Sequence, residues 1–377
     1  MGLPLQGLRV VDLTQDFAGP FCTMILSDLG AEVIKIEKSG GGDETRAWGP
    51  PFVNGISAYF VSLNRGKKSV VLDLKTREGQ RVIQKLVVDS DIFVESSRPG
   101  QMARFNLDYP RLRRLNKALV YASISSFGQT GPYRDRLGYD LIAFAMSGIM
   151  ASTGEKGRPP IRMSVPVADL AVGHYASTAI LAILSRRLVT GKGGYVDLSL
   201  HDSIVSWLTY LASYYFATGK EPQRLGSAHP SIVPYQAFRC KDKYLVLAIG
   251  NDHQWENFCR AAGLERFFSD GRFSTNPSRV KNGHLLIPVL QRMFRRRDAK
   301  EWQTILDKAK VPVAPVFGIR DVMHDPHVRN RKMIVGSKRN ASHLGSPMRF
   351  YRTSQKETTS APQLGQHTRE ILDSLRT

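Results

Sequence analysis

The sequence predicts an α/β fold built on a parallel, doubly wound sheet, and two observations lead to this prediction. Short apolar runs alternate with stretches of helical period through the first 130 residues. Parallel strands need a crossover connection, usually a helix, so this alternation favours a parallel sheet. Such sheets place ligands beyond the carboxyl ends of their strands, and functional residues are expected there.

The expected elements of this sheet follow in chain order. Helices are expected at 20–29, stopping at Gly30, and at 76–88. A long buried helix is expected over 169–188, where small and apolar residues follow a carboxylate and end in two arginines, as the helix dipole favours. The expected strands are 8–14, 31–37, 69–74, 91–96, 118–125 and 196–200.

A different pattern starts at Ile232 and indicates a smaller second lobe. It comprises a strand at 244–250 and helices at 254–262 and 283–296. The last part of the chain holds a further strand-like segment and a short helix at 368–375.

The charge balance is strongly basic: 53 Lys and Arg against 33 Asp and Glu give a formal net charge of +20. Such a field concentrates anions near the protein. A phosphorylated cofactor with carboxylate substrates fits this field, and so does nucleic acid, although no nucleic-acid motif is present. A solvated basic surface is the plain alternative.

Other features narrow the class of protein. Cys22, Cys240 and Cys259 are too few and too scattered for a disulfide framework or a zinc site. The cluster around His324 and His327 fits no common metal template and is expected to be a turn, so no metal is predicted. No stretch of about 20 apolar residues is found, and strand-like sequence begins almost at once, so neither a membrane span nor a leader is expected. The predicted location is the cytoplasm.

Asp169 is the most informative carboxylate. It is the only acidic residue between Glu155 and Asp197, in an apolar setting at a helix start. There it is expected to accept backbone N–H bonds and stay ionised, with neighbouring N–H groups available to an oxyanion. An ionised carboxylate in a desolvated pocket is a plausible covalent nucleophile. A simple helix cap remains the alternative. The absence of a Gly-x-Ser-x-Gly elbow argues against a serine thioesterase.

Basic residues crowd the segment 35–68 around a run of three glycines, Gly40–Gly42. They pair with phosphates or coat the surface, and the pattern leaves both readings open. Neither nucleotide-binding glycine fingerprint is matched. The basic residues are Lys35, Lys38, Arg46, Arg65, Lys67 and Lys68.

Strings along nearly the whole chain together resemble the class III CoA-transferases, the family of formyl-CoA transferase and carnitine CoA-transferase. In the first half they are LQGLRVVDLT, AGPFCTMILSDLGAEVIKIE, GGGDETRAWGPPF, NRGKKSVVLDLK, VESSRPGQM and SSFGQTGPYRDRLGYD. In the rest they are PVADLAVGHYA, GKGGYVDLSLHDS, SAHPSIVPYQAF and QLGQHT.

The resemblance implies a covalent route through Asp169, which matches the family's catalytic aspartate. Asp169 attacks an acyl-CoA to give an anhydride, becomes a CoA thioester, and passes CoA to a second carboxylic acid. CoA is then a substrate, and no permanent cofactor is expected. The implied CoA contacts are Phe17, Ala18, Lys38, Leu72, Ser96, Ser97, Arg98, Pro99, Arg104 and Arg136. The implied substrate contacts are Trp48, Tyr59, Tyr139, Asp140 and His229.

The resemblance also implies an unusual assembly. Each chain makes a large Rossmann-like domain from both its ends and a small domain from its middle, and two chains interlock as rings in a homodimer. The expected parts are a large domain over 1–200, a linker over 201–225, a small domain over 226–315, and a second linker with the return to the large domain over 316–377.

The same family contains acyl-CoA racemases, which are the main alternative. Those carry a histidine before the aspartate of a Gly-x-Asp motif, whereas this chain has Tyr139 before Asp140. The glycine-rich small-domain loop of formyl-CoA transferase is absent too, which disfavours oxalate and formate. The strings most resemble the branch that uses succinyl-CoA with glutarate or hydroxymethylglutarate, where Arg65, Arg162 or His229 is expected to hold a distal carboxylate.

Overall fold

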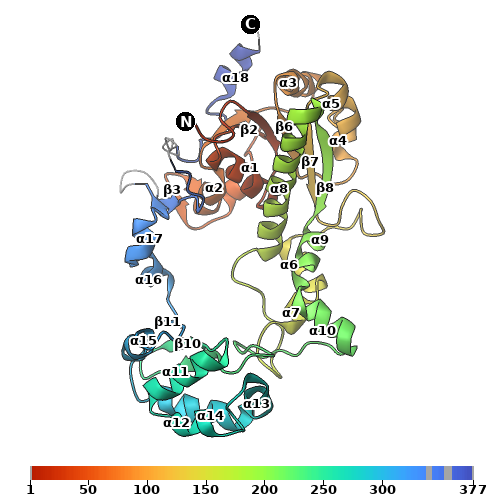
Figure 1. Ribbon diagram of the computed structural model, residues 1–377. Helices are drawn as coiled ribbons and strands as arrows, with labels where there is room; N and C mark the ends of the chain where they lie inside the picture. The colour runs from red at the N-terminus through yellow and green to blue at the C-terminus, as the bar shows by residue number, and fades with distance from the viewer. Residues whose placement is uncertain (1, 337–341, 352–358, 376–377) are drawn as a thin grey trace. The chain divides into compact units, whose positions relative to one another are not determined.

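The computed structural model describes residues 2–336, 342–351 and 359–375 (Figure 1). The chain divides into two compact units. The first comprises Met1–Ile149, Arg162–Ala217 and Arg329–Thr377, and the second comprises Met150–Ile161 and Thr218–Val328. Residues 201–217, expected in a linker, therefore belong to the first unit.

A six-stranded sheet forms the centre of the first unit and confirms the predicted α/β class. Its strand order is β5-β2-β1-β6-β7-β8, and all five pairings are parallel. Val11 in the central strand pairs with Ile34 on one side and Phe93 on the other. The strands are β1 Arg9–Leu13, β2 Glu32–Glu37, β5 Lys67–Val71, β6 Ile92–Glu95, β7 Val120–Ser125 and β8 Gly194–Ser199.

Helices pack on this sheet as a doubly wound fold requires. Helix α1 (Ala18–Asp28) packs with α8 (Val167–Thr190), which also contacts β7 and β8. The apolar stripe of α3 (Arg77–Val88) joins strand residues Val11, Ile34 and Phe93 in one core, together with Leu112 of α5 (Tyr109–Leu115). The C-terminal helix α18 (Thr368–Ser374) contacts β5 and contributes Ile371 to the same core.

Shorter elements complete the first unit. The helices are η1 Glu44–Ala47, α2 Ala58–Asn64, α4 Gln101–Arg104, α6 Asp140–Met146, α9 Leu200–Val205, η2 Ser206–Leu208 and α10 Tyr210–Thr218. Two pairs of short antiparallel strands are β3 Phe52–Val53 with β4 Ile56–Ser57, and β12 Ile334–Val335 with β13 His343–Leu344. Helix α7 Ile149–Ser152 lies where the first unit meets the second in sequence.

Helix α8 departs from the sequence prediction in two ways. It was expected to be buried, yet only half of its most apolar window is buried, and Leu188 and Val189 near its end are each 88% exposed. By length and composition it is also apolar enough to cross a membrane. The prediction that no stretch of about 20 apolar residues is present did not anticipate this helix. Long core helices of water-soluble proteins meet the same criterion, so this finding alone assigns no membrane.

The second unit is built on a three-stranded antiparallel sheet in the order β11-β10-β9. Its core gathers Trp255, Phe258 and Phe294 with side chains of the strands. The buried Arg279 lies over the Trp255 ring and pairs with Asp252 at 2.8 Å. The strands are β9 Tyr235–Arg239, β10 Tyr244–Ala248 and β11 Val313–Pro315. The helices are α11 Asp252–Ala262, α12 Glu265–Ser269, α13 Asn276–Lys281, α14 Gly283–Phe294, α15 Ala299–Lys308 and α16 Ile319–His324, and α17 Pro326–Asn330 follows at the end of the unit.

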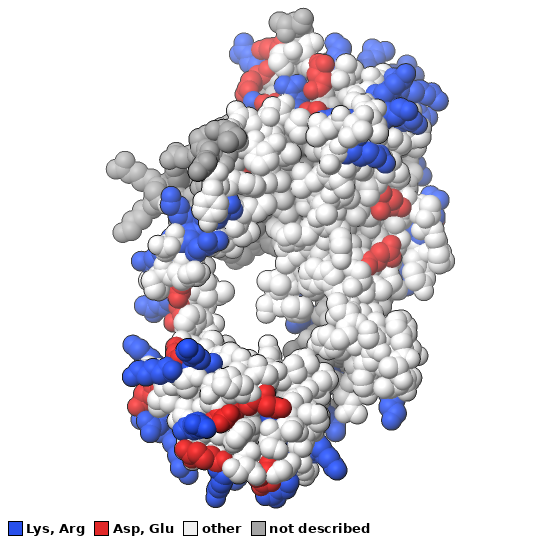
Figure 2. All heavy atoms as spheres, viewed as in Figure 1, with Lys and Arg blue, Asp and Glu red and all other residues white. Residues whose placement is uncertain are grey.

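The basic charge of the chain is dispersed over both units. Figure 2 shows Lys and Arg side chains scattered over this face of the molecule, with one gathering in the region of α3, α4 and α5. Arg113 and Arg114 contribute to it from the exposed side of α5.

Candidate active site

Asp169 lines a cavity of about 520 Å³ in the first unit. The cavity lies beyond the carboxyl ends of β1, β6 and β7, where a parallel sheet is expected to hold its ligand. Its wall brings together segments that are far apart in the sequence: Gln15–Ala18, Trp48, Tyr59, Ser96, Ile124–Ser126, Gly138–Leu141, Arg162, Pro166, Asp169 and Leu200.

The carboxyl of Asp169 lies in the first turn of α8, as predicted, but it is not the cap of that helix. Asp140, at the start of α6, provides the cap: its Oδ1 accepts the backbone N–H groups of Ala168 at 2.7 Å and of Asp169 at 3.5 Å. Those two N–H groups are therefore not available to an oxyanion in this conformation. Among the described residues, none donates a hydrogen bond to the Asp169 carboxylate.

The expectation that Asp169 stays ionised is wrong for the chain in this state. Burial raises the pKa of Asp169 to about 8, and the carboxylates of Asp140 and Asp16 add to the effect. Burial also raises the pKa of Asp140, although the two N–H groups that it accepts oppose the rise. The cavity therefore holds three carboxyl groups, of which Asp169 is the hardest to ionise.

Aromatic side chains form one wall of the Asp169 cavity. The Tyr59 ring lies 5.1 Å from the Trp48 ring and 5.9 Å from the Phe17 ring, both edge to face. Burial raises the pKa of Tyr59, with Asp169 as the largest charge contribution, so its hydroxyl is neutral at physiological pH. Tyr139 lies at the rim and is 63% exposed.

A second cavity, of about 740 Å³, adjoins the first and is lined by four arginines. The two share the lining residues Asp16, Ser96, Ser125, Ser126, Gly138 and Tyr139. Six of the ten predicted CoA contacts line this second cavity: Ser96, Ser97, Arg98, Pro99, Arg104 and Arg136. Arg134 also lines it and was not predicted.

The four arginines differ in how much of their charge is already paired. Arg134 pairs with Asp135 at 3.5 Å, whereas Arg98, Arg104 and Arg136 form no ion pair within the described ranges. An anionic group that enters this cavity thus meets three guanidinium groups without a carboxylate partner. Arginine is well suited to bind phosphate oxygens in this setting.

The basic cluster expected over residues 35–68 is not a free phosphate site. Each of its six members is paired with a carboxylate: Lys35–Asp43, Lys38–Glu44, Arg46–Glu37, Arg65–Asp28, Lys67–Asp12 and Lys68 with both Glu32 and Glu370. Lys35 and Lys67 are completely or almost completely buried. Arg65 is buried beside Met24 and Asp28, so it is not placed to hold a substrate carboxylate.

Three further predicted residues lie outside both cavities. Lys38 and Leu72 follow the ends of β2 and β5, and the Leu72 backbone N–H donates to the carbonyl of Glu37 at 2.9 Å. His229 belongs to the second unit, where its ring contacts Tyr235 and its Nδ1 accepts the Ser231 N–H. The described residues contain no group of three or more His, Cys, Asp or Glu side chains that could hold a metal.

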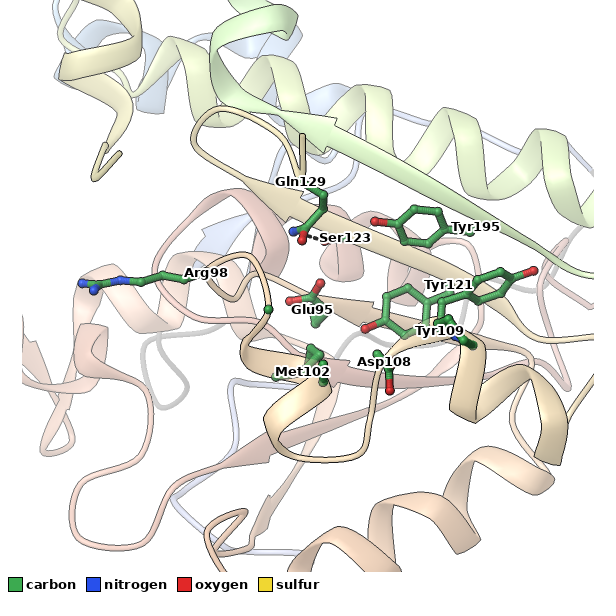
Figure 3. Close-up of a pocket in the computed structure, with 12 residues that line it drawn as sticks. Glu95, Arg98, Met102, Asp108, Tyr109, Tyr121, Ser123, Gln129 and Tyr195 are labelled. Carbon is green, nitrogen blue, oxygen red and sulfur yellow. Dashed lines mark hydrogen bonds between the residues drawn. The ribbon is translucent and has the colours of Figure 1, made fainter. Parts of the chain in front are cut away.

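Another cavity, of about 340 Å³, lies on the α4–α5 side of the sheet and does not include Asp169 (Figure 3). Figure 3 shows Tyr109, Tyr121 and Tyr195 on one side of it and Glu95 on another. Burial raises the pKa of Glu95 to about 7, and Glu95 accepts the backbone N–H of Ser97 at 2.7 Å. Glu95 thus supports the turn that carries predicted CoA contacts.

Comparison with known proteins decides the family. The model of CoA-transferase family III matches residues 5–368. The chain belongs to this family. Family III members transfer CoA, so the chain is an enzyme of this type, and the acyl-CoA is its substrate.

Relatives of known sequence and structure agree with this assignment. A succinyl-CoA:glutarate CoA-transferase of Mus musculus is 41% identical over 98% of this chain and 86% of its own length. A succinate–glutarate CoA-transferase of Agrobacterium fabrum is 37% identical over 99% of this chain and 96% of its own length. The crystal structure of a CAIB/BAIF family protein from Brucella suis matches with a TM-score of 0.90 at 38% identity and covers all of both chains.

Asp16 and Arg134 line the cavities but were not among the predicted site residues. Asp16 lies between two of the strings that resemble the family, and Arg134 lies inside one of them, SSFGQTGPYRDRLGYD. The rule that ligands lie beyond strand ends was a usable signal for Asp16, which follows the end of β1 at Leu13.

Proposed function

We propose that this enzyme moves CoA from succinyl-CoA to a dicarboxylic acid such as glutarate, with Asp169 as the nucleophile. The observation that carries the proposal is the position of Asp169 in a cavity that adjoins the arginine-lined cavity. An acyl-CoA that spans the two would bring its thioester to the carboxylate and its phosphates to the guanidinium groups. The names of the two glutarate transferases support the choice of substrates.

The reaction proceeds through two kinds of acyl-aspartate. A carboxylate oxygen of Asp169 attacks the thioester carbon and the C–S bond breaks. CoA departs as the thiolate, and the acyl group and Asp169 are then joined as a mixed anhydride. The thiolate then attacks the Asp169 carbonyl of the anhydride, which releases the donor acid and leaves an aspartyl-CoA thioester. The acceptor carboxylate repeats these steps in reverse, so that it departs as the new acyl-CoA and Asp169 is regenerated.

The CoA contacts follow from the same placement. Arg98, Arg104 and Arg136 hold phosphate groups in the second cavity, beside Ser96, Ser97 and Pro99. Phe17 and Ala18 line the cavity of the nucleophile, and Lys38 and Leu72 extend the contact surface along the strand ends.

The acceptor's distal carboxylate binds Arg162, because Arg162 is the one Lys or Arg side chain among the residues that line the Asp169 cavity. Trp48, Tyr59 and Tyr139 flank the acyl chain, and Asp140 orients the nucleophile through the start of α8. The substrate role that the resemblance implies for His229 stays a prediction.

The active form is an interlocked homodimer in the cytoplasm that binds neither nucleic acid nor a membrane. An exposed apolar surface in the first unit supports the proposed dimer. Helix α10 has no buried residue although its sequence is YLASYYFAT, and Phe216 is 83% exposed. Exposed apolar surface of this kind marks an interaction site, and a second chain would cover it together with the open side of α8.

An acyl-exchange assay tests the proposal. The purified protein is incubated with succinyl-CoA and a panel of free acids, and acyl-CoA products are measured by mass spectrometry. We expect glutaryl-CoA to appear in step with free succinate, to be lost in Asp169→Ala, and to need more glutarate in Arg162→Ala. If no dicarboxylate gives a new acyl-CoA, the substrate choice is wrong. If Asp169→Ala transfers CoA at the wild-type rate, the mechanism is wrong.

The same samples test the racemase alternative. Among the lining residues of the Asp169 cavity there is no histidine to exchange a proton at the α carbon. We therefore expect no deuterium at the α carbon of a 2-methylacyl-CoA that is incubated with the enzyme in heavy water. Incorporation of deuterium would favour the racemase.

A further inference from the structure

Asp16 occupies a special position between the two cavities. It lies in the loop between β1 and α1 and lines both the Asp169 cavity and the arginine-lined cavity. Its backbone has a φ of 66°, in the left-handed region that asparagine and aspartate adopt more readily than most residues. A group that passes from one cavity to the other passes this side chain.

The backbone of the Asp16 loop is held by the buried side chains of Asp43 and Lys35. The Asp16 backbone N–H lies 3.4 Å from Oδ1 of Asp43, and Asp43 pairs with the buried Lys35 at 2.8 Å. Lys35 also donates to the carbonyl of Thr14 at 2.8 Å. The backbone is therefore held in place, whereas none of the described residues forms a hydrogen bond or ion pair with the Asp16 carboxylate.

The charges around Asp16 are mostly of its own sign. Asp140 and Asp169 line the same cavity, and Asp43 and Glu44 lie behind the loop. Of the cations near it, Lys35 is paired with Asp43 and Lys38 with Glu44. Burial raises the pKa of Asp16 to about 6, and the carboxylates of Asp43 and Glu44 add to the effect.

Of the two carboxyl groups near Asp169, Asp16 differs from Asp140 in having no hydrogen-bond or ion-pair partner among the described residues. Asp140 reaches Asp169 from α6, Tyr59 from α2 is neutral, and Arg162 is the one cation in the cavity wall. Asp140 already accepts two N–H groups at the start of α8, so part of its charge is stabilised. The Asp16 carboxylate has no such partner, and its field acts on Asp169 across the cavity.

We propose that Asp16 is a tuning residue that controls when Asp169 becomes a nucleophile. Its uncompensated negative charge favours the protonated form of Asp169 in the empty site. Asp169 attacks the thioester from its ionised form, after its proton has passed to solvent water, and the negative charge of Asp16 lowers the fraction of Asp169 in that form at a given pH. This inference rests on the proposed nucleophilic role of Asp169.

The test is the pH profile of covalent adduct formation, not of turnover. Wild type is mixed with succinyl-CoA from pH 5.5 to 9, quenched with hydroxylamine, and the hydroxamate at Asp169 is quantified by peptide mass spectrometry. Asp16→Asn keeps the shape and the tolerance for positive φ but removes the charge. We expect its acidic limb to move to lower pH, with roughly 3- to 10-fold more adduct at pH 6.5 when each profile is scaled to its own plateau, because one like charge is gone.

A second variant of Asp16 and a control variant at a distant carboxylate complete the test. Asp16→Gly also accepts a positive φ and should shift the profile in the same direction. Asp89→Asn removes a carboxylate from the exposed end of α3, outside the three cavities described, and should leave the profile unchanged.

Failure of this inference is distinguishable from failure of the proposed function. If wild type forms no Asp169 adduct at any pH, the nucleophilic role itself is wrong. If adduct forms but the Asp16→Asn and Asp16→Gly profiles coincide with wild type, or fall by one factor at every pH, Asp16 does not tune Asp169. A shift of equal size in Asp89→Asn would also overturn the inference, since net charge alone would then explain it.

Discussion

Two clusters of carboxyl groups, one buried and one partly buried, lie close together in the first unit, and they differ in which charges compensate them. In the first cluster, Asp12 and Asp43 are paired with Lys67 at 3.2 Å and Lys35 at 2.8 Å, and all four side chains are inaccessible to solvent. In the second cluster, Asp16, Asp140 and Asp169 line one cavity with a single cation, Arg162, in its wall.

The difference in compensation sets the protonation of each cluster. Burial by itself would raise the pKa of Asp12, but Lys67, Lys35 and two threonine hydroxyls hold it at about 2. The pKa of Asp169 instead rises to about 8, because burial and like charges act together. The compensated cluster stays ionised and anchors the strand ends, whereas the uncompensated cluster changes charge in the range where an enzyme works.

The largest expected effect comes from breaking the compensated cluster. Lys67→Met leaves Asp12 buried without its nearest cation, and we expect a loss of about 3–5 kcal/mol in the free energy of unfolding. Lys68→Met is the matched control on the same strand, where the half-exposed lysine pairs with Glu32 and Glu370. Its expected loss is about 1 kcal/mol or less. Urea unfolding of both variants checks this, and equal losses would contradict the comparison.

The next effect is a pH dependence of stability that comes from Asp169. Because its folded pKa of about 8 lies above the value for an unfolded chain, its contribution to stability is present below about pH 4 and is lost as the pH rises through 8. Asp169→Asn removes this dependence. We expect the variant to gain about 1–3 kcal/mol over wild type between pH 4 and 9, allowing for solvent screening. Urea titrations across this range measure it; a gap that stays constant with pH would show that Asp169 titrates normally.

The smallest effect separates charge from hydrogen bonding at Asp140. Asp140→Asn keeps an oxygen that can accept the N–H groups of Ala168 and Asp169, and we expect stability close to wild type. Asp140→Ala removes that acceptor and should cost about 1 kcal/mol, the usual value for a lost helix cap. Thermal unfolding of the pair measures the difference. Two equally stable variants would show that Asp140 does not act as the cap of α8.

Much of the architecture was predictable from local patterns. A predicted strand overlaps each of the six strands of the parallel sheet, although β5 and β8 begin two residues before the predicted ranges. The position of Asp169 at a helix start was also correct. The exposed side of α8 was missed, because an apolar sequence cannot tell whether its own chain or another surface covers it.

The site was predicted less completely than the fold. Motif resemblance selected six CoA contacts and Tyr139 among the residues that line the arginine-rich cavity, but it did not select Asp16 or Arg134. Local charge counting did not resolve the segment 35–68, since each lysine or arginine there pairs with a carboxylate, three of them within the segment and three with partners outside it. Lys67 meets Asp12 only because β5, β2 and β1 lie in register side by side.

The sequence by itself determined the α/β class, the strands of the sheet and the carboxylate at the start of α8. These depend on hydrophobic period and helix-end chemistry, which act over a few neighbouring residues. Only the tertiary structure decided which carboxyl groups are compensated: Asp12 beside Lys67 is ionised, and Asp169 beside Asp16 and Asp140 is not. The reason is physical, since a pKa depends on burial and on charges within a few ångströms, and folding brings those charges from distant parts of the chain.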